Sequence, residues 1–229
     1  MNISSIVLNT PHSSDVFPYG KDRWDEGLDC CISRWTDWLT DEVFVRAGRG
    51  SQSIVPVIFP WSRFFCDVER LKGDALGSVG QGIVYTRFDG FSRSISEGEK
   101  ESVIADYYDT HIERLRSALA PDAFLIDCHS FPPDLSDVEV CIGLNDDWSR
   151  PDETLIAGVT DIFRRAGYKV GLNTPYSNSI SPEMPFPYPS MMIELNKSTY
   201  MTPDGASDPN KMQRLESTVG KAYSRILDF

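Results

Sequence analysis

The chain has 229 residues, of which 41% are hydrophobic, so it is long and apolar enough to form one domain with a buried core. Its formal net charge is −12, and no positive field is available to offset phosphate repulsion. We therefore expect no nucleic-acid and no anionic-membrane partner. The N-terminus does not resemble a signal peptide, no run approaches about 20 apolar residues, and the five cysteines form no CxxC pair. These features predict a soluble, reduced, cytoplasmic protein.

Short apolar runs alternate with helical patterns along the chain. The predicted strands are residues 5–9, 43–46, 54–59, 123–128, 138–144, 168–173 and 190–195. Apolar residues recur at helical spacing over residues 28–39, 104–118, 155–166 and 212–226. This alternation predicts an α/β fold in which helices cover both faces of a sheet. The glycine-rich residues 73–93 and the proline-rich residues 174–189 are predicted as long loops, which are often functional.

Three of the predicted strands lead to side chains that can carry chemistry. His12 follows the first strand, Asp127 and His129 end the run FLIDCHS, and Glu194 lies in MMIELN. In open α/β sheets, ligands bind beyond the carboxyl ends of the strands. Two neutral imidazoles and a carboxylate are the ligands of a catalytic zinc ion, and a further glutamate can act as a general base.

Each of these residues also has an ordinary structural interpretation. His12 follows Thr-Pro and is typical of a turn, whereas His111 lies on the apolar face of its helix and is predicted to be a core histidine. Glu194 is less easily explained, because a carboxylate in a buried strand must be paired, metal-bound or protonated.

Two further clusters could bind a substrate. WSRFFCDVER contains Arg63, Glu69 and Arg70, and the planar fork of an arginine suits a substrate carboxylate. The alternative is a solvated ion-pair cluster. Ser177 and Asn178, which follow Pro175-Tyr176, could donate hydrogen bonds to a ligand or form an ordinary turn.

Taken in order, eight short motifs resemble the N-formylglutamate amidohydrolase family. They are TPHSS, TDWLTDEVF, SRFFCDVER, GQGIVYT, YYDTH, DCHSFP, NTPYSNS and IELNKSTYM, and they run from about residue 12 to residue 201. The family is related in fold to zinc-dependent exopeptidases and aspartoacylase-type deacylases. The resemblance implies a single domain over residues 1–229, with a mixed, mostly parallel central sheet flanked by helices. It also implies a zinc-dependent amidohydrolase that releases formate from an N-formyl amino acid such as N-formyl-L-glutamate.

Carried over onto this sequence, the resemblance assigns His12 and His129 as imidazole ligands of one zinc ion. Glu194 matches the catalytic carboxylate. Arg63 and Arg70 match the arginines that polarise the scissile carbonyl or hold a substrate carboxylate. Tyr176, Ser177 and Asn178 are then expected to orient the substrate.

The third metal ligand has two candidates. Asp15 stands three residues after His12, which imitates the spacing of the related exopeptidases, whereas Asp37 lies in the family motif TDWLTD. We prefer Asp37, because the motif is more specific than a single spacing. A solvated carboxylate remains the alternative for Asp37, which lies off the apolar stripe of its helix.

One residue departs from the pattern of the related deacylases, which have asparagine before the second arginine. Here that residue is Glu69. The charge of Glu69 would weaken the hold of Arg70 on an anionic substrate. Alternatively, the Glu69 carboxylate would orient Arg70 or contact a cationic group. The sequence therefore leaves two other functions open. One is a zinc carboxypeptidase or amidase with a different acyl-amino-acid or peptide substrate, and the other is a non-catalytic binding protein on the same fold.

Overall fold

A computed structural model describes residues 2–21 and 23–229 and contains a six-stranded sheet in the order β2-β1-β5-β8-β6-β7. The strands are β1 (Ser5–Thr10), β2 (Ile54–Ile58), β5 (Ala123–Phe131), β6 (Val140–Gly143), β7 (Val170–Leu172) and β8 (Ser190–Asn196). The first four in the sheet order are parallel, β6 is antiparallel to β8, and β7 is parallel to β6. The mixed, mostly parallel sheet predicted for a single α/β domain is confirmed.

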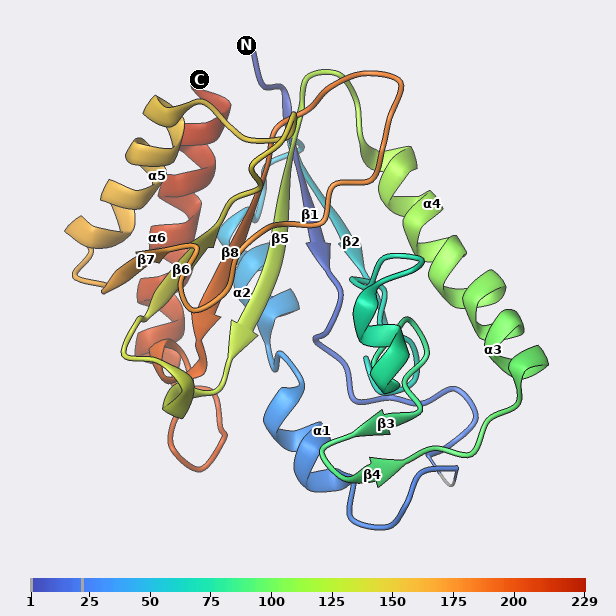
Figure 1. The fold of residues 1–229 in the computed structure, drawn as a ribbon. Helices are drawn as coiled ribbons and strands as arrows, with labels where there is room; N and C mark the ends of the chain where they lie inside the picture. Colours follow the sequence, from blue (N-terminus) through green and yellow to red (C-terminus); the bar gives the residue numbers. More distant parts are fainter. Residues whose placement is uncertain (1, 22) are drawn as a thin grey trace.

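Helices cover both faces of this sheet (Figure 1). On one face lie α2 (Thr40–Ala47), α5 (Glu153–Arg165) and α6 (Pro209–Leu227). On the other lie α3 (Glu97–Val103), the π-helical turn η2 (Ile104–Tyr108) and α4 (Asp109–Ala118). Asp152 and Asp208 begin α5 and α6, because each carboxylate accepts a hydrogen bond from a backbone N–H of the first turn.

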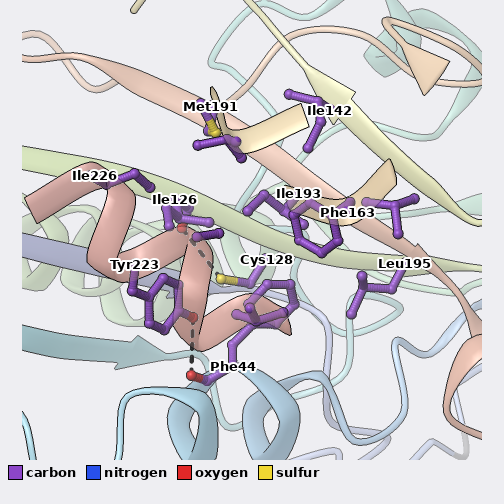
Figure 2. Close-up of a cluster of buried hydrophobic side chains, with 14 of the residues drawn as sticks. Phe44, Ile126, Cys128, Ile142, Phe163, Met191, Ile193, Leu195, Tyr223 and Ile226 are labelled. Atoms are coloured by element: carbon purple, nitrogen blue, oxygen red, sulfur yellow. Dashed lines mark hydrogen bonds between the residues drawn. The ribbon is translucent and has the colours of Figure 1, made fainter. Parts of the chain in front are cut away.

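The larger core lies between the sheet and α2, α5 and α6. Ile126 and Cys128 of β5 pack there beside Phe44, and the Tyr223 hydroxyl donates to the Phe44 carbonyl (Figure 2). Leu125, which precedes Ile126 in β5, packs instead in the hydrophobic cluster under α4. Successive residues of β5 thus face opposite sides of the sheet, as the pleat requires.

The strand predicted for residues 43–46 is wrong, because these residues lie in α2. A short apolar run fits either element by periodicity alone. Here Val43 and Phe44 are buried together with Thr40, at helical spacing, and α2 packs against α6. Helix α1 (Asp29–Trp35) is shorter than the predicted 28–39, since Thr36 at its C-terminus has an extended backbone with ψ of 134°, and Leu39 before α2 has a left-handed φ of 63°.

The carboxyl ends of β1, β5 and β8 point toward α1 and a small hairpin (Figure 1). The hairpin consists of β3 (Arg87–Phe88) and β4 (Phe91–Ser92), and it follows the 3₁₀ helix η1 (Ala75–Val79) within the predicted loop 73–93. Two further 3₁₀ turns are η3 (Pro133–Leu135) and η4 (Lys197–Thr199). Among the described residues, no helix has the length and apolar character needed to cross a membrane.

Candidate active site

Alternation along the strands places the predicted reactive residues on one face. Ile126 and Cys128 occupy the larger core, so Asp127 and His129 face the opposite side. The sheet register pairs Asn9 with Asp127, and His129 with Glu194. Three parallel strand ends therefore bring an amide, an imidazole and two carboxylates to one edge of the sheet.

Each imidazole lies between two carboxylates. Nε2 of His12 lies 2.8 Å from Oδ1 of Asp67, and Nε2 of His129 lies 3.1 Å from Oδ1 of Asp127. Their Nδ1 atoms face Oδ2 of Asp37, at 3.8 Å from His12 and 3.1 Å from His129. Nδ1 of His12 is buried and has no hydrogen-bond partner among the described residues. For His12 this arrangement matches the usual support of a metal-binding histidine, in which the second ring nitrogen is bound to a carboxylate. In His129 the two nitrogens are reversed, because Nδ1 is hydrogen-bonded to Asp37 and Nε2 is buried without a hydrogen-bond partner among the described residues.

Asp37 lies in the link between α1 and α2 and is almost completely buried, with 2% of its surface exposed. Its backbone N–H donates to the His12 carbonyl at 2.9 Å, which fixes it beside that histidine. Burial alone would raise the pKa of Asp37, but the hydrogen bond and charge of His129 hold the pKa below its usual value. The solvated alternative for Asp37 does not hold, whereas its rival Asp15 is exposed.

Glu69 approaches the same two histidines. Its Oε1 lies 3.4 Å from Nε2 of His129, and its Oε2 lies 3.8 Å from Nδ1 of His12. His12, Glu69 and His129 can offer ligand atoms that all lie within 4.8 Å of one another. Glu69 is thus a second candidate for the third ligand, although its side chain is 27% exposed and that of Asp37 only 3%. The sequence analysis assigned Glu69 to substrate binding and did not predict its approach to His12 and His129.

A cavity of about 640 Å³ opens over these groups. Its lining includes most of the predicted site residues, namely Asp37, Arg63, Glu69, Arg70, His129, Tyr176, Ser177 and Glu194. His12 is fully buried. Asn178 does not belong to this lining; its backbone carbonyl approaches Gly143, where an added Cβ would lie only 2.4 Å away.

Glu194 is a buried carboxylate that lines the cavity. Burial raises its pKa to about 8, although the positive charge of His129 opposes this shift. Its Oε2 atom has no hydrogen-bond partner among the residues that the structure describes. A carboxyl with such a pKa can both take up and release a proton near neutral pH, so Glu194 is suited to exchange a proton with a molecule in the cavity.

The two predicted arginines meet at a residue that the sequence analysis did not single out. Nη2 of Arg63 and Nη2 of Arg70 each lie 3.4 Å from the Tyr85 hydroxyl oxygen. Tyr85 donates to Oδ2 of Asp67 at 2.5 Å, and Arg63 donates to the same oxygen at 3.1 Å. Tyr85 appears in the sequence only within the motif GQGIVYT, and no local spacing connects it to residues 15 and 22 positions earlier.

A second chain of hydrogen bonds runs from His129 into the protein. Asp127 accepts from the side chain of Asn9 at 2.8 Å and from the N–H of Ile180 at 2.9 Å. Oδ1 of Asn9 lies 2.9 Å from Nε2 of His111. His111 is 1% exposed, and burial lowers its pKa to about 4. It is thus a buried histidine, as predicted, and it supports the site through two intervening residues.

Comparisons with known proteins identify the family and the fold of this chain. A family model described as N-formylglutamate amidohydrolase matches residues 4–201. The crystal structure of an N-formylglutamate amidohydrolase from Ralstonia eutropha JMP134 is similar, with a TM-score of 0.82 and 17% identity over 100% of this chain and 94% of the other. A gene product of Agrobacterium tumefaciens gives a TM-score of 0.69 and 16% identity over 97% and 92% of the two chains. A search of curated protein sequences finds no significant match.

At these identities the solved structures show the shared fold, a mixed α/β domain. The family model, in contrast, covers most of the chain and includes every predicted catalytic and metal-binding position from His12 to Glu194. The chain therefore belongs to the N-formylglutamate amidohydrolase family.

Proposed function

We propose that this protein is a zinc-dependent amidohydrolase that cleaves N-formyl-L-glutamate, or a similar N-acyl amino acid, to formate or the corresponding acid and the free amino acid. Membership of an amidohydrolase family supports amide hydrolysis. The observation that carries the proposal is the convergence of His12 and His129 on Asp37, beside Glu194 and under an open cavity.

The residues present fit a zinc ion. Nδ1 of His12 is a buried donor atom without a partner among the described residues, and it faces a second imidazole and a carboxylate. Two imidazoles and one carboxylate leave a coordination position open, which is typical of catalytic zinc sites. His12, His129 and Asp37 would hold the ion, with Glu69 as the alternative carboxylate. A zinc ion bound there would lower the pKa of a water molecule toward about 7 and polarise the scissile carbonyl.

The protein's own residues then perform the proton transfers. Glu194 accepts a proton from the attacking water and delivers it to the amide nitrogen as the carbon–nitrogen bond breaks. Arg63 donates hydrogen bonds to the oxygen on which negative charge develops. Asp67 keeps His12 in the orientation that leaves its Nδ1 without a hydrogen-bond partner among the described residues, and Asp127 and Asp37 lie on either side of the His129 ring. Arg70, with Tyr176 and Ser177, would orient the carboxylates of the substrate.

The test compares Glu194→Gln with a matched change, Glu183→Gln, at an exposed position. Zinc content is measured by elemental analysis of protein purified without chelator, and turnover by formate release from N-formylglutamate. We expect stoichiometric zinc in both variants and a rate at least about 100-fold lower in Glu194→Gln only. Near-normal turnover in Glu194→Gln would refute the assignment of the base. Wild-type protein without zinc would refute the metal proposal and favour a binding role.

The cavity also supports a second group of substrates. Its volume of about 640 Å³ lies in the range of sites for ligands much larger than N-formylglutamate, and its lining includes Trp35, Phe88 and Phe131. N-acyl amino acids with large apolar groups and short peptides are therefore included in the same assay. The cytoplasmic location and the absence of nucleic-acid and membrane partners stay predictions.

A further inference from the structure

The side chain of Tyr85 lies where the zinc-site residues meet the two arginines. Its ring is fully buried and stacks on Phe88, with the ring centres 5.8 Å apart and the planes at 6°. Phe64 packs edge-on against it. The ring is therefore held on two sides, and its hydroxyl has little freedom to move away from Arg63 and Arg70.

The contacts of the Tyr85 hydroxyl require a group that can both accept and donate hydrogen bonds. It is close to two guanidinium groups, at 3.4 Å from each, and it donates its proton to Asp67. A hydroxyl can accept and donate at once, whereas an arginine has only donors and an ionised carboxylate only acceptors. Tyr85 thus lets two like charges approach one neutral oxygen, while Asp67 supplies the compensating negative charge.

Asp67 has no free oxygen to replace this contact. Its Oδ1 is bound to Nε2 of His12 at 2.8 Å and to the N–H of Glu69 at 3.1 Å. Its Oδ2 faces Arg63 and Tyr85. Without the hydroxyl, the Oδ2 atom would still hold Arg63, but Arg70 would lose its Tyr85 contact and keep only the longer 3.6 Å approach of its Nε to Asp67.

Both arginines keep N–H groups available to a ligand. Their side chains are 15% and 22% exposed, and both line the cavity. Nε of Arg63 and Nε of Arg70 are buried without a hydrogen-bond partner among the described residues. Arginine N–H groups bind planar anions most strongly through two parallel hydrogen bonds, so the placement of the two planes determines what they can bind.

We propose that Tyr85 is a positioning residue that holds Arg70 beside Arg63, so that Arg70 binds one carboxylate of the substrate. The proposal rests on the proposed function for the identity of that substrate. Tyr85 acts through the guanidinium group of Arg70 and not on the amide that is cleaved. Its removal is therefore expected to weaken binding of the carboxylate and to leave the chemical step and the zinc ligands in place.

The backbone around Tyr85 supports this role. Gly80 adopts a left-handed φ of 88°, and an added Cβ there would lie 2.8 Å from the Thr86 hydroxyl. The N–H groups of Thr86 and Arg87 both donate to the Gly80 carbonyl, which closes the loop that carries Tyr85. Arg93 further ties this segment to the site by donating to the Phe65 carbonyl at 2.9 Å. A site held by such supporting contacts is preorganised for its ligand.

The test uses Tyr85→Phe, which keeps the ring and removes only the hydroxyl. The matched control is Tyr223→Phe, which removes another buried hydroxyl, 3.0 Å from the Phe44 carbonyl and in the opposite core (Figure 2). Zinc-loaded proteins are assayed with N-formylglutamate and with its α- and γ-monoamides. We expect Tyr85→Phe to raise KM for N-formylglutamate about tenfold, or about 1.4 kcal/mol, and to change kcat less than about threefold.

The monoamides identify the group that is bound. For the monoamide that lacks the bound carboxylate, Tyr85→Phe is expected to have the same KM as wild type, and Tyr223→Phe is expected to match wild type with all three substrates. Equal losses of Tyr85→Phe on all three substrates, or a loss confined to kcat, would overturn the proposal.

A binding measurement separates this inference from the proposed function. Calorimetric titration with N-acetylglutamate needs no turnover, so it is informative even if wild type hydrolyses none of the substrates. We expect Tyr85→Phe to weaken Kd about tenfold, with zinc content unchanged. A Kd equal to that of wild type, or no binding by wild type, would contradict the role of Tyr85, whereas absent hydrolysis with intact binding would contradict only the proposed function.

Discussion

The buried histidine of α4 makes the stability of this protein depend on pH. His111 is 1% exposed, its ring packs edge-on against Phe59, and its Nε2 lies 2.9 Å from Oδ1 of Asn9. Burial is the main cause that lowers its pKa from 6.5 to about 4, and Arg114 adds to the shift while Asp127 opposes it. The imidazole is therefore neutral in the folded protein at pH values where the unfolded chain binds a proton.

The sign and size follow from this difference. Because the unfolded state binds the proton more strongly, the contribution to stability is complete above about pH 6.5 and is lost as the pH falls toward 4. The full loss corresponds to about 3.4 kcal/mol, and between pH 8 and pH 5 it is about 2 kcal/mol. A loss of this size is a large part of the stability of an ordinary domain.

The change to test is His111→Gln, which removes the titration and keeps an N–H donor for Asn9. Urea unfolding of both proteins is followed by tryptophan fluorescence at pH 8 and pH 5, without metal, so that zinc release does not contribute. Other groups titrate equally in both chains. From pH 8 to pH 5, we expect the unfolding free energy of wild type to fall by about 2 kcal/mol more than that of His111→Gln. The same difference in unfolding free energy at both pH values would refute a neutral His111 in the folded state.

Two further predictions concern the metal ligands and the loop beside β6. Asp37→Ala is expected to weaken zinc binding, measured by competition with a chelator, more than Glu69→Ala, because Asp37 is the more buried carboxylate and lies 3.1 Å from a ring nitrogen of His129, against 3.4 Å for Glu69; the reverse order would make Glu69 the ligand. Gly143→Ala is expected to cost about 1–3 kcal/mol of unfolding free energy, because its Cβ would lie 2.4 Å from the Asn178 carbonyl. Gly98→Ala in α3, with open space around it, is the control and is expected to be neutral or stabilising.

The strands and their reactive ends could be predicted because they depend on local periodicity. In FLIDCHS the alternation of apolar and polar residues already separates Cys128 from Asp127 and His129, and the structure places them on opposite faces. Residues 43–46 could not be assigned in this way, since a run of only four residues fits a strand as well as one turn of a helix. Packing against α6 decided between the two, and that contact joins segments about 170 positions apart.

The supporting residues of the site were much harder to predict. Glu69 was interpreted through its neighbour Arg70, but its carboxylate turns to His12 and His129, which are 57 and 60 positions away. Tyr85 carries no charge and sits in a glycine-rich loop, so nothing local distinguishes it from a core aromatic residue. Such contacts are set by how loops fold back over the strand ends, which a single sequence does not encode in a short pattern.

The pairing of buried polar atoms distinguishes the supporting carboxylates Asp67 and Asp127 from His12 and Glu194. Asp67 and Asp127 each accept several hydrogen bonds, so their carboxylates are satisfied without any ligand. Nδ1 of His12 and Oε2 of Glu194 are buried and have no such partner among the described residues. Buried polar atoms are rarely left unpaired, because each costs about 1–3 kcal/mol. Nδ1 of His12 and Oε2 of Glu194 each carry such a cost, and a bound zinc ion and a water molecule would relieve it there.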